Sequence, residues 1–192
     1  TRSRIRTKRN AGAAMAWCGK TNSEAVIRKA MDTHVFLDTS GRAGEAVLGL
    51  ADTWRYVGRG VTQAHLLDRI LRGGLAGPLP EQVSISALRA TEEHMDACLA
   101  DLRRARMARP DADLVTDEFA NGVRMARHAC RLATSRLQGA AAARIRRSRV
   151  RELDDIMAEH VRLWRARNRP GGLVDSLRVF RERRAEYAGE TS

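Results

Sequence analysis

Residues 84–108 have the sequence SISALRATEEHMDACLADLRRARMA, and this segment is the clearest evidence for the class of fold. Its apolar residues, from Leu88 to Leu102, recur every three or four positions, the spacing that places side chains on one face of an α-helix. Ser84 or Ser86 can accept hydrogen bonds from the first free amides of such a helix, and a proline two residues after the segment cannot continue it. We therefore predict a long amphipathic helix that ends near residue 108 and packs its apolar face against other helices.

Three further segments downstream show the same helical spacing. They span residues 116–133, 143–167 and 173–187, with Thr116 as the expected cap of the first. The turn NRPGG at 168–172 separates the last two, because proline cannot continue a helix and glycine tolerates left-handed backbone angles. Aromatic residues make up only 4% of the chain, which is too few for a β-sandwich or barrel. Long helices with short connections predict an all-α chain built as an antiparallel helical bundle.

The part of the chain before residue 84 is less regular. Helical spacing over 42–57 predicts one helix there, and the stretch GGLAGPLP at 73–80 is the clearest break in the chain. Residues 1–22 begin with a basic run that has no apolar period. We therefore predict an irregular basic arm over 1–22 and a helical bundle domain over 23–192, with a subdivision at 73–83 as an alternative.

The chain is strongly basic. Its formal net charge is +12, from 35 basic and 23 acidic residues, and only three of the basic residues are lysines. Such a charge is typical of contact with the phosphates of a nucleic acid or with an anionic surface. The alternative is that the arginines occupy solvated helix faces, which the near-absence of lysine favours. Two clusters carry most of the excess: Arg2, Arg4, Arg6, Lys8 and Arg9 in the first, and Arg144, Arg146, Arg147, Arg149 and Arg151 in the second.

No residue pattern in the sequence predicts a cofactor or a metal. The GKT at 19–21 lacks the glycine that a P-loop needs five residues earlier, where Ala14 stands. His94 and Cys98 can share a helix face, but a zinc site needs about four converging ligands. Neighbouring acidic residues on a helix do not face each other, so they form no catalytic pair. We expect no catalytic residue, no metal and no cofactor, and therefore no catalysis by this chain alone.

The cysteines and the hydropathy of the chain bear on its compartment. The three cysteines are far apart and form no CxxC pair, so a reducing compartment is expected. No run approaches the roughly 20 apolar residues of a membrane span, and the N-terminal segment has no apolar stretch typical of a signal peptide. We therefore expect a cytoplasmic protein that has no membrane partner.

One segment resembles a known family. Residues 163–177, with the sequence LWRARNRPGGLVDSL, are similar to the end of the C-terminal helical region of bacterial glycoside hydrolases like the β-N-acetylhexosaminidases, glycoside hydrolase family twenty. In that region a helix runs into an Arg-Asn-x-x-Gly-Gly-Leu turn and then into a last helix. Residues 41–58, 87–107 and 117–133 fit the same region, so that the resemblance covers roughly residues 25–185.

The resemblance implies a helical module without a catalytic site of its own. In such enzymes an upstream (β/α)₈ barrel carries the chemistry, and an Asp-Glu pair acts together with the acetamido group of the substrate. This chain has no room for the barrel, which needs about 200 residues or more. We expect an accessory module that packs on a catalytic barrel in cis or in trans. The chain would then be a fragment, a split gene product or a free-standing relative.

Two alternatives to this reading of the chain remain open. Arg167 and Asn168, in the turn of the resembling segment, either contact a ligand or only form a corner between two helices. The chain as a whole is alternatively a basic helical nucleic-acid-binding protein that uses the arginine clusters at 2–9 and 144–151.

Overall fold

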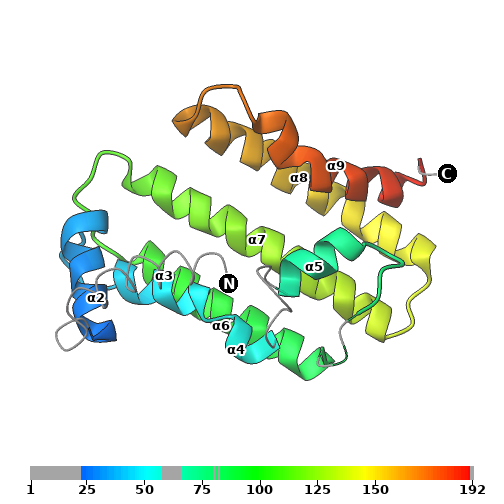
Figure 1. Cartoon of the computed structure of the whole chain (residues 1–192), viewed down its shortest axis with the longest axis horizontal. Coiled ribbons are helices and arrows are strands. Elements are labelled where there is room, and N and C mark those ends of the chain that lie inside the picture. The colour runs from blue at the N-terminus through cyan, green and yellow to red at the C-terminus, as the bar shows by residue number, and fades with distance from the viewer. Residues whose placement is uncertain (1–22, 58–65, 80, 82, 191–192) are drawn as a thin grey trace.

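The computed structural model of the chain describes residues 23–57, 66–79, 81 and 83–190. All regular elements within these ranges are helices (Figure 1), which confirms the predicted all-α fold class. The predicted basic arm, residues 1–22, lies outside the described ranges. No helix in the described part of the chain has both the length and the apolar character that crossing a membrane requires.

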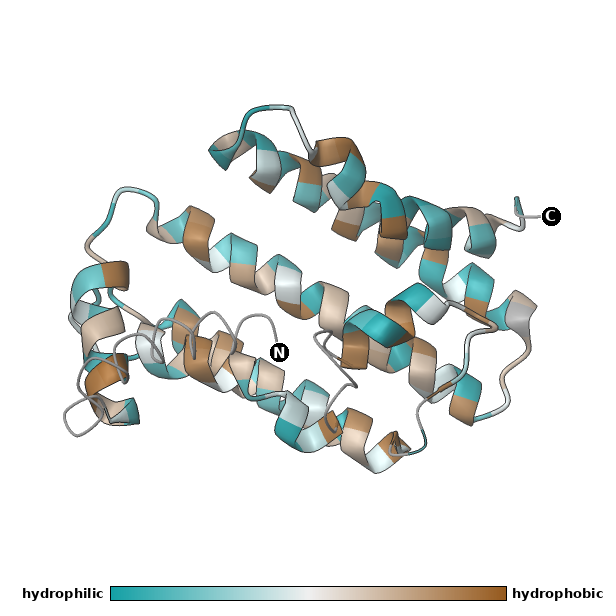
Figure 2. Ribbon diagram, viewed as in Figure 1, coloured by the Kyte–Doolittle hydropathy of each residue, from teal (hydrophilic) through white to brown (hydrophobic). Residues whose placement is uncertain are grey.

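Four long helices form the body of the bundle. They pack as consecutive antiparallel pairs, α6 with α7, α7 with α8, and α8 with α9, so α7 lies between α6 on one side and α8 on the other (Figure 1). Hydrophobic and hydrophilic residues alternate along each of them (Figure 2), as expected for amphipathic helices. The four helices are α6 (Ile85–Arg103), α7 (Ala112–Leu137), α8 (Ala142–Arg167) and α9 (Leu173–Ala188).

Shorter helices from the first part of the chain cover two of the long ones. Helices α3 and α4 pack on α6, whereas α5 packs on α7 and touches α9. A π-helical turn, η1, follows α2 directly and leads into α3. These elements are α2 (Glu24–Ala30), η1 (Met31–Phe36), α3 (Ala43–Ala51), α4 (Trp54–Val57) and α5 (Leu66–Gly73).

The larger of two hydrophobic clusters extends across the whole bundle. It joins Leu66 of α5 to Leu88 of α6 and Leu132 of α7, each of which is fully buried. Residues on both sides of the segment 73–83 therefore share one core. A second, smaller cluster around Phe36 packs η1 and α3 against the ends of α6 and α7.

Two buried carboxylates determine where α3 begins. Asp38 accepts hydrogen bonds from the backbone amides of Arg42 and Ala43 at 2.7 and 2.9 Å, and Asp32 accepts one from Gly44 at 2.6 Å. These bonds satisfy amides that a helix leaves free at its start, and the negative charges favour the helix dipole. Glycine is required at position 44, because a Cβ there would lie 2.7 Å from a backbone carbonyl oxygen of α2.

Asp38 also determines where α6 ends. Its carboxylate accepts a hydrogen bond from the backbone amide of Arg106 at 2.7 Å, across 68 positions of sequence. The chain around Arg106 therefore leaves the helical path, and α6 ends at Arg103. The predicted end near residue 108 was wrong. The apolar spacing continues past Arg103, but the hydrogen bond from the Arg106 amide to the distant Asp38 carboxylate ends the helix earlier.

Two other predicted helix boundaries were wrong as well. Thr116 does not cap a helix, since it lies inside α7, where its hydroxyl donates to the carbonyl oxygen of Ala112 at 3.0 Å. Residues 42–57 form two helices instead of one. In the turn between α3 and α4, the hydroxyl of Thr53 donates to the carbonyl oxygen of Leu50 at 2.6 Å. In both cases a threonine hydroxyl donates to a nearby backbone carbonyl oxygen. Apolar spacing does not predict which threonine makes such a bond.

Candidate functional site

The arginine cluster of α8 is divided between several faces of the helix. Arg144, Arg149 and Arg151 line hollows beside α7, whereas the guanidinium of Arg146 lies near Gly189 at the end of α9. Arg147 is exposed. An α-helix turns by about 100° per residue, so a cluster that is dense in sequence cannot present all its members to one ligand. The other predicted cluster, Arg2, Arg4, Arg6, Lys8 and Arg9, lies outside the described residues.

The hollows beside α7 and α8 form a first candidate site, which we call the basic groove. One hollow has a volume of about 640 Å³ and the other about 470 Å³, and both are lined by Arg131, Ser148 and Arg149. Three arginines of α7 face three of α8, which sequence inspection missed because the α7 arginines are interleaved with core residues. The charged residues of the basic groove are Arg124, Arg127, Arg131, Arg144, Arg149 and Arg151, with Glu92, Glu152 and Asp155.

Glu152 is the centre of an ion-pair network within the basic groove. Its carboxylate oxygens lie 2.6 Å from Nη1 of Arg131, 3.2 Å from Nη1 of Arg149 and 3.1 Å from Nδ1 of His128. Burial raises the pKa of the Glu152 carboxyl, but the hydrogen bond to His128 and the nearby positive charges outweigh it and lower the pKa to about 2. The carboxylate is therefore ionised at neutral pH and holds two of the groove arginines in place.

His128 joins this network to the last helix. Its imidazole is fully buried, and its Nε2 lies 3.1 Å from the hydroxyl oxygen of Tyr187 on α9. Burial raises the pKa of Tyr187, so that its phenol remains protonated. The hydrogen-bonded series Glu152–His128–Tyr187 thus links α8, α7 and α9. Its side chains have little access to solvent. We assign it a structural role.

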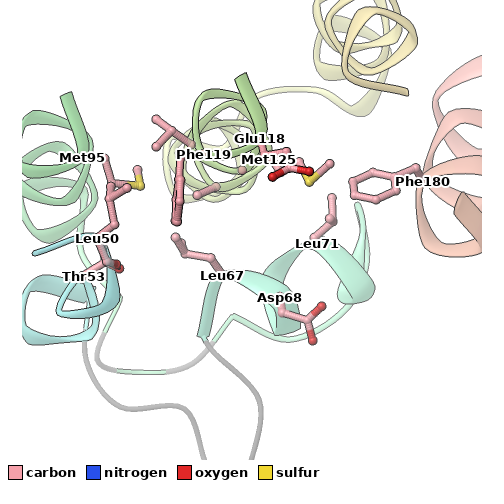
Figure 3. Close-up of a pocket in the computed structure, with 13 residues that line it drawn as sticks. Leu50, Thr53, Leu67, Asp68, Leu71, Met95, Glu118, Phe119, Met125 and Phe180 are labelled. Carbon is pink, nitrogen blue, oxygen red and sulfur yellow. The ribbon is translucent and has the colours of Figure 1, made fainter. Parts of the chain in front are cut away.

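A second candidate site lies on the opposite face of α7. A hollow of about 350 Å³ is walled by α3, α5, α6, α7 and α9, with apolar side chains that converge from all five helices. Figure 3 shows Leu67 and Leu71 of α5 pointing toward Phe119 and Met125 of α7, while Phe180 of α9 closes one end. Phe119, Met125 and Phe180 lie at the mouth of this hollow, and each is only half-buried.

A neighbouring hollow extends this second site along α7. It has a volume of about 270 Å³ and shares Glu118, Gly122 and Met125 with the first hollow. Its other wall is the end of α8, where Leu163 and Trp164 lie. The two hollows together form one depression, which we call the apolar groove. Its floor is α7, and Gly122 is the point at which its two halves meet.

Two neighbouring residues on the floor of the apolar groove are unusual. Gly122 stands in the middle of α7, and a Cβ at this position would meet no described atom within 4 Å. Asn121 is 2% exposed, and its Nδ2 donates to the carbonyl oxygen of Ile156 at 3.4 Å. Its Oδ1 has no hydrogen-bond partner among the described residues. The floor therefore combines free space with an unused hydrogen-bond acceptor.

The two residues singled out in the NRPGG turn have different positions. Arg167 donates from Nε to Glu118 at 2.6 Å, and its Nη1 lies 2.9 Å from Asp111, so it ties the end of α8 to the start of α7. Asn168 lines the apolar groove beside Trp164. The indole of Trp164 donates to the carbonyl oxygen of Arg169 at 3.0 Å, which holds the corner closed. Arg167 is thus engaged as a corner residue, and Asn168 borders the groove.

The described cysteines are not activated. Burial raises the pKa of the Cys98 thiol to about 11 and that of Cys130 to about 12. The sulfur of Cys98 lies 3.6 Å from Nε2 of His94, so these two residues share a helix face as predicted. No group of three or more potential metal ligands occurs in the part of the chain that the structure describes.

A scan against protein-family models, a search of curated proteins and a search of solved structures find no match to this chain.

Proposed function

We propose that this chain is a non-catalytic helical accessory module that packs on the catalytic barrel of a glycoside hydrolase, in cis or in trans, and stabilises it. One observation carries the proposal. Segment 163–177, which resembles the C-terminal region of these enzymes, forms one end of the apolar groove through Leu163, Trp164 and Asn168. The resemblance and the open apolar surface therefore point to the same face of the molecule.

The floor of the apolar groove supports docking of another polypeptide. A glycine in the interior of a helix costs about 0.5–1 kcal/mol relative to alanine, and no described neighbour of Gly122 occupies the space that its missing side chain leaves. Glycine lets a partner backbone approach a helix more closely than any other residue does. A segment of the barrel domain that crosses α7 at Gly122 accounts for this choice of residue.

The walls of the apolar groove have the composition of an interface core. Such cores are enriched in aromatic residues and methionine, and Phe119, Met125, Trp164 and Phe180 are each half-buried around the opening. Burial of these side chains by the barrel domain would stabilise both partners.

The test mixes the purified full chain with the catalytic barrel domain of a β-N-acetylhexosaminidase of glycoside hydrolase family twenty and measures binding by isothermal titration calorimetry. We expect a complex with the wild-type chain and about a tenfold or greater loss of affinity for Gly122→Arg, which fills the groove with a long side chain. Ala97→Arg is the matched control, since Ala97 is an exposed position on α6 away from the groove. It should bind like the wild type.

Two results would contradict the proposal. The first is the absence of a complex with the wild-type chain at concentrations on the order of 100 μM. The second is equal affinity of Gly122→Arg and wild type, which would place the contact elsewhere. Thermal melts of both variants confirm that any loss of binding is not a loss of fold.

A further inference from the structure

We propose that the basic groove binds the phosphate backbone of a nucleic-acid strand. This site lies on the face of α7 opposite the apolar groove, so the inference does not depend on the proposed accessory function. Six arginines and three acidic residues line it, and the groove therefore carries a local excess of positive charge. Clustered arginines facing each other across a groove attract phosphates and release their counterions.

Internal ion pairs leave part of this charge available. Glu152 and Glu92 are engaged by Arg131, and Glu152 also by Arg149, while Arg127 pairs with Asp96. These pairs fix the positions of Arg127, Arg131 and Arg149 on the groove walls. Arg144 and Arg151 are exposed and form no ion pair with another described residue. Arg144 lines the larger hollow and Arg151 the smaller one, and both are free to contact an incoming anion.

Hydroxyl groups complete the lining between the arginines. Ser148 lies at the junction of the two hollows, and Thr134 and Ser135 line the wall formed by α7. Serine and threonine hydroxyls are common donors to phosphate oxygens, alongside arginine. The hydroxyl of Ser135 donates to the carbonyl oxygen of Arg131 at 2.8 Å, and that of Ser148 donates to the carbonyl oxygen of Ile145 at 3.0 Å. Each hydroxyl would exchange this internal hydrogen bond for one to a phosphate oxygen.

The length of the basic groove favours a polymer over a single phosphate. Its lining on α7 runs from Arg124 to Gln138, which is about 21 Å along a helix that rises 1.5 Å per residue. One strand of a duplex carries about six phosphates over that distance. None of the described residues that line the groove is aromatic, so the groove lacks the rings on which bases usually stack. Recognition is therefore of the backbone and independent of base sequence.

The test is fluorescence anisotropy of labelled 20-nucleotide DNA, single-stranded and duplex, with the full chain at several salt concentrations. We expect binding at low salt that weakens with a log–log slope of about −2 for the single strand, as expected if roughly three phosphates are neutralised. The variant Arg144→Glu/Arg151→Glu should lower the affinity at least about tenfold. Both positions are exposed, so the fold should survive, and a thermal melt checks this.

The matched control is Arg165→Glu/Arg178→Glu. Both arginines are exposed, lie outside the groove and change the net charge of the chain by the same amount. Affinity that falls only for the groove variant supports the proposal. Three results would overturn it: no binding of either DNA at low salt, an equal loss for both variants, or no loss for the groove variant. An equal loss would mean that only net charge attracts DNA, and no loss would place the contact on another part of the chain.

Discussion

At the scale of single residues, two neighbours on α7 carry the most information about binding. Gly122 leaves an open space on an otherwise regular helix, and Asn121 keeps a buried amide oxygen without a hydrogen-bond partner among the described residues. Each lowers the stability of the isolated chain, because glycine weakens a helix and an unpaired buried acceptor loses its hydration. A partner that packs against Gly122 would offset the cost of the glycine.

Substitution of Gly122 tests whether the space beside its Cα is empty in the folded chain. Gly122→Ala should raise the free energy of unfolding by about 0.5–1 kcal/mol, because alanine favours the helix and its Cβ meets no described atom. Chemical denaturation with urea gives the value. Gly44→Ala is the contrasting variant and should destabilise the fold, since its Cβ would approach a carbonyl oxygen to 2.7 Å. A destabilised Gly122→Ala would mean that the groove is already filled.

The carboxylate of Asp38 makes stability depend on pH. Burial raises its pKa, but hydrogen bonds from the backbone amides of Ala43, Ser40 and Arg42 and from the hydroxyl of Ser40 outweigh this and hold the pKa far below its ordinary value. Because the folded-state pKa is the lower one, this contribution is complete above the ordinary pKa near 4. It is lost as the pH falls below that value.

Asp38→Asn should therefore lower the free energy of unfolding by about 2–4 kcal/mol at pH 7, since charge-assisted hydrogen bonds are weakened. Urea denaturation at several pH values between 2 and 7 should also show a shallower loss of stability in acid for this variant. Glu93→Gln, at an exposed position of α6, is the control and should follow the wild type. Identical acid profiles for Asp38→Asn and wild type would contradict this account.

At the scale of secondary-structure elements, α9 is held mainly by contacts with α8 and by one buried polar link. Tyr187 places its hydroxyl on His128, which in turn contacts Glu152, so one hydrogen-bonded chain connects three helices. Apolar packing of Leu177 and Phe180 adds to this attachment, as do the His160–Ser176 hydrogen bond and the Arg184–Asp154 ion pair. The last helix therefore depends on a contact between residues 59 positions apart in the sequence.

Removal of one hydroxyl tests this link. Tyr187→Phe should lower the free energy of unfolding by about 1–3 kcal/mol, because it leaves Nε2 of the buried His128 without a partner. Differential scanning calorimetry gives the change in melting temperature. Tyr56→Phe is the matched control, as Tyr56 is 42% exposed, and it should melt with the wild type. An equal effect of both substitutions would show that the His128 contact contributes nothing specific.

At the scale of the whole molecule, α7 separates two surfaces of opposite chemistry. The basic groove lies between α7 and the first half of α8, and the apolar groove lies across the first half of α7 on its other face. A partner on one surface leaves the other accessible. The proposed barrel contact and the proposed nucleic-acid contact are therefore separable by variants on opposite faces.

Assay of the purified chain with an aryl-N-acetylglucosaminide tests the proposal that catalysis lies elsewhere. We expect no release of the aryl group above background, because neither groove brings together a free pair of carboxylates: Glu118 is bound by Arg167, and Glu152 by two arginines. A β-N-acetylhexosaminidase of glycoside hydrolase family twenty is the positive control. Turnover by this chain, and its loss in Glu118→Gln, would overturn the accessory role.

Much of the fold follows from local pattern. Apolar spacing predicts α8 and α9 almost to the residue, because each helix carries its stripe within its own sequence and the NRPGG turn at 168–172 separates them. The C-terminal end of α6 and the division of residues 42–57 did not follow from it, whereas the start of α6 at the Ser84 cap did. At these places the Asp38 carboxylate or the Thr53 hydroxyl forms a hydrogen bond with a backbone group that would otherwise continue the helix. Apolar spacing does not reveal such a bond.

The grooves depend on tertiary structure in a stronger sense. The sequence by itself determined that the chain is helical, basic and furnished with an arginine cluster at 144–151. Only the packing of α7 against α8 decided which of these arginines share a surface, and it added Arg124, Arg127 and Arg131. The apolar groove likewise joins Leu50, Phe119 and Phe180. Periodicity assigns each side chain to a face of its own helix, but the place where two faces meet depends on how the helices pack.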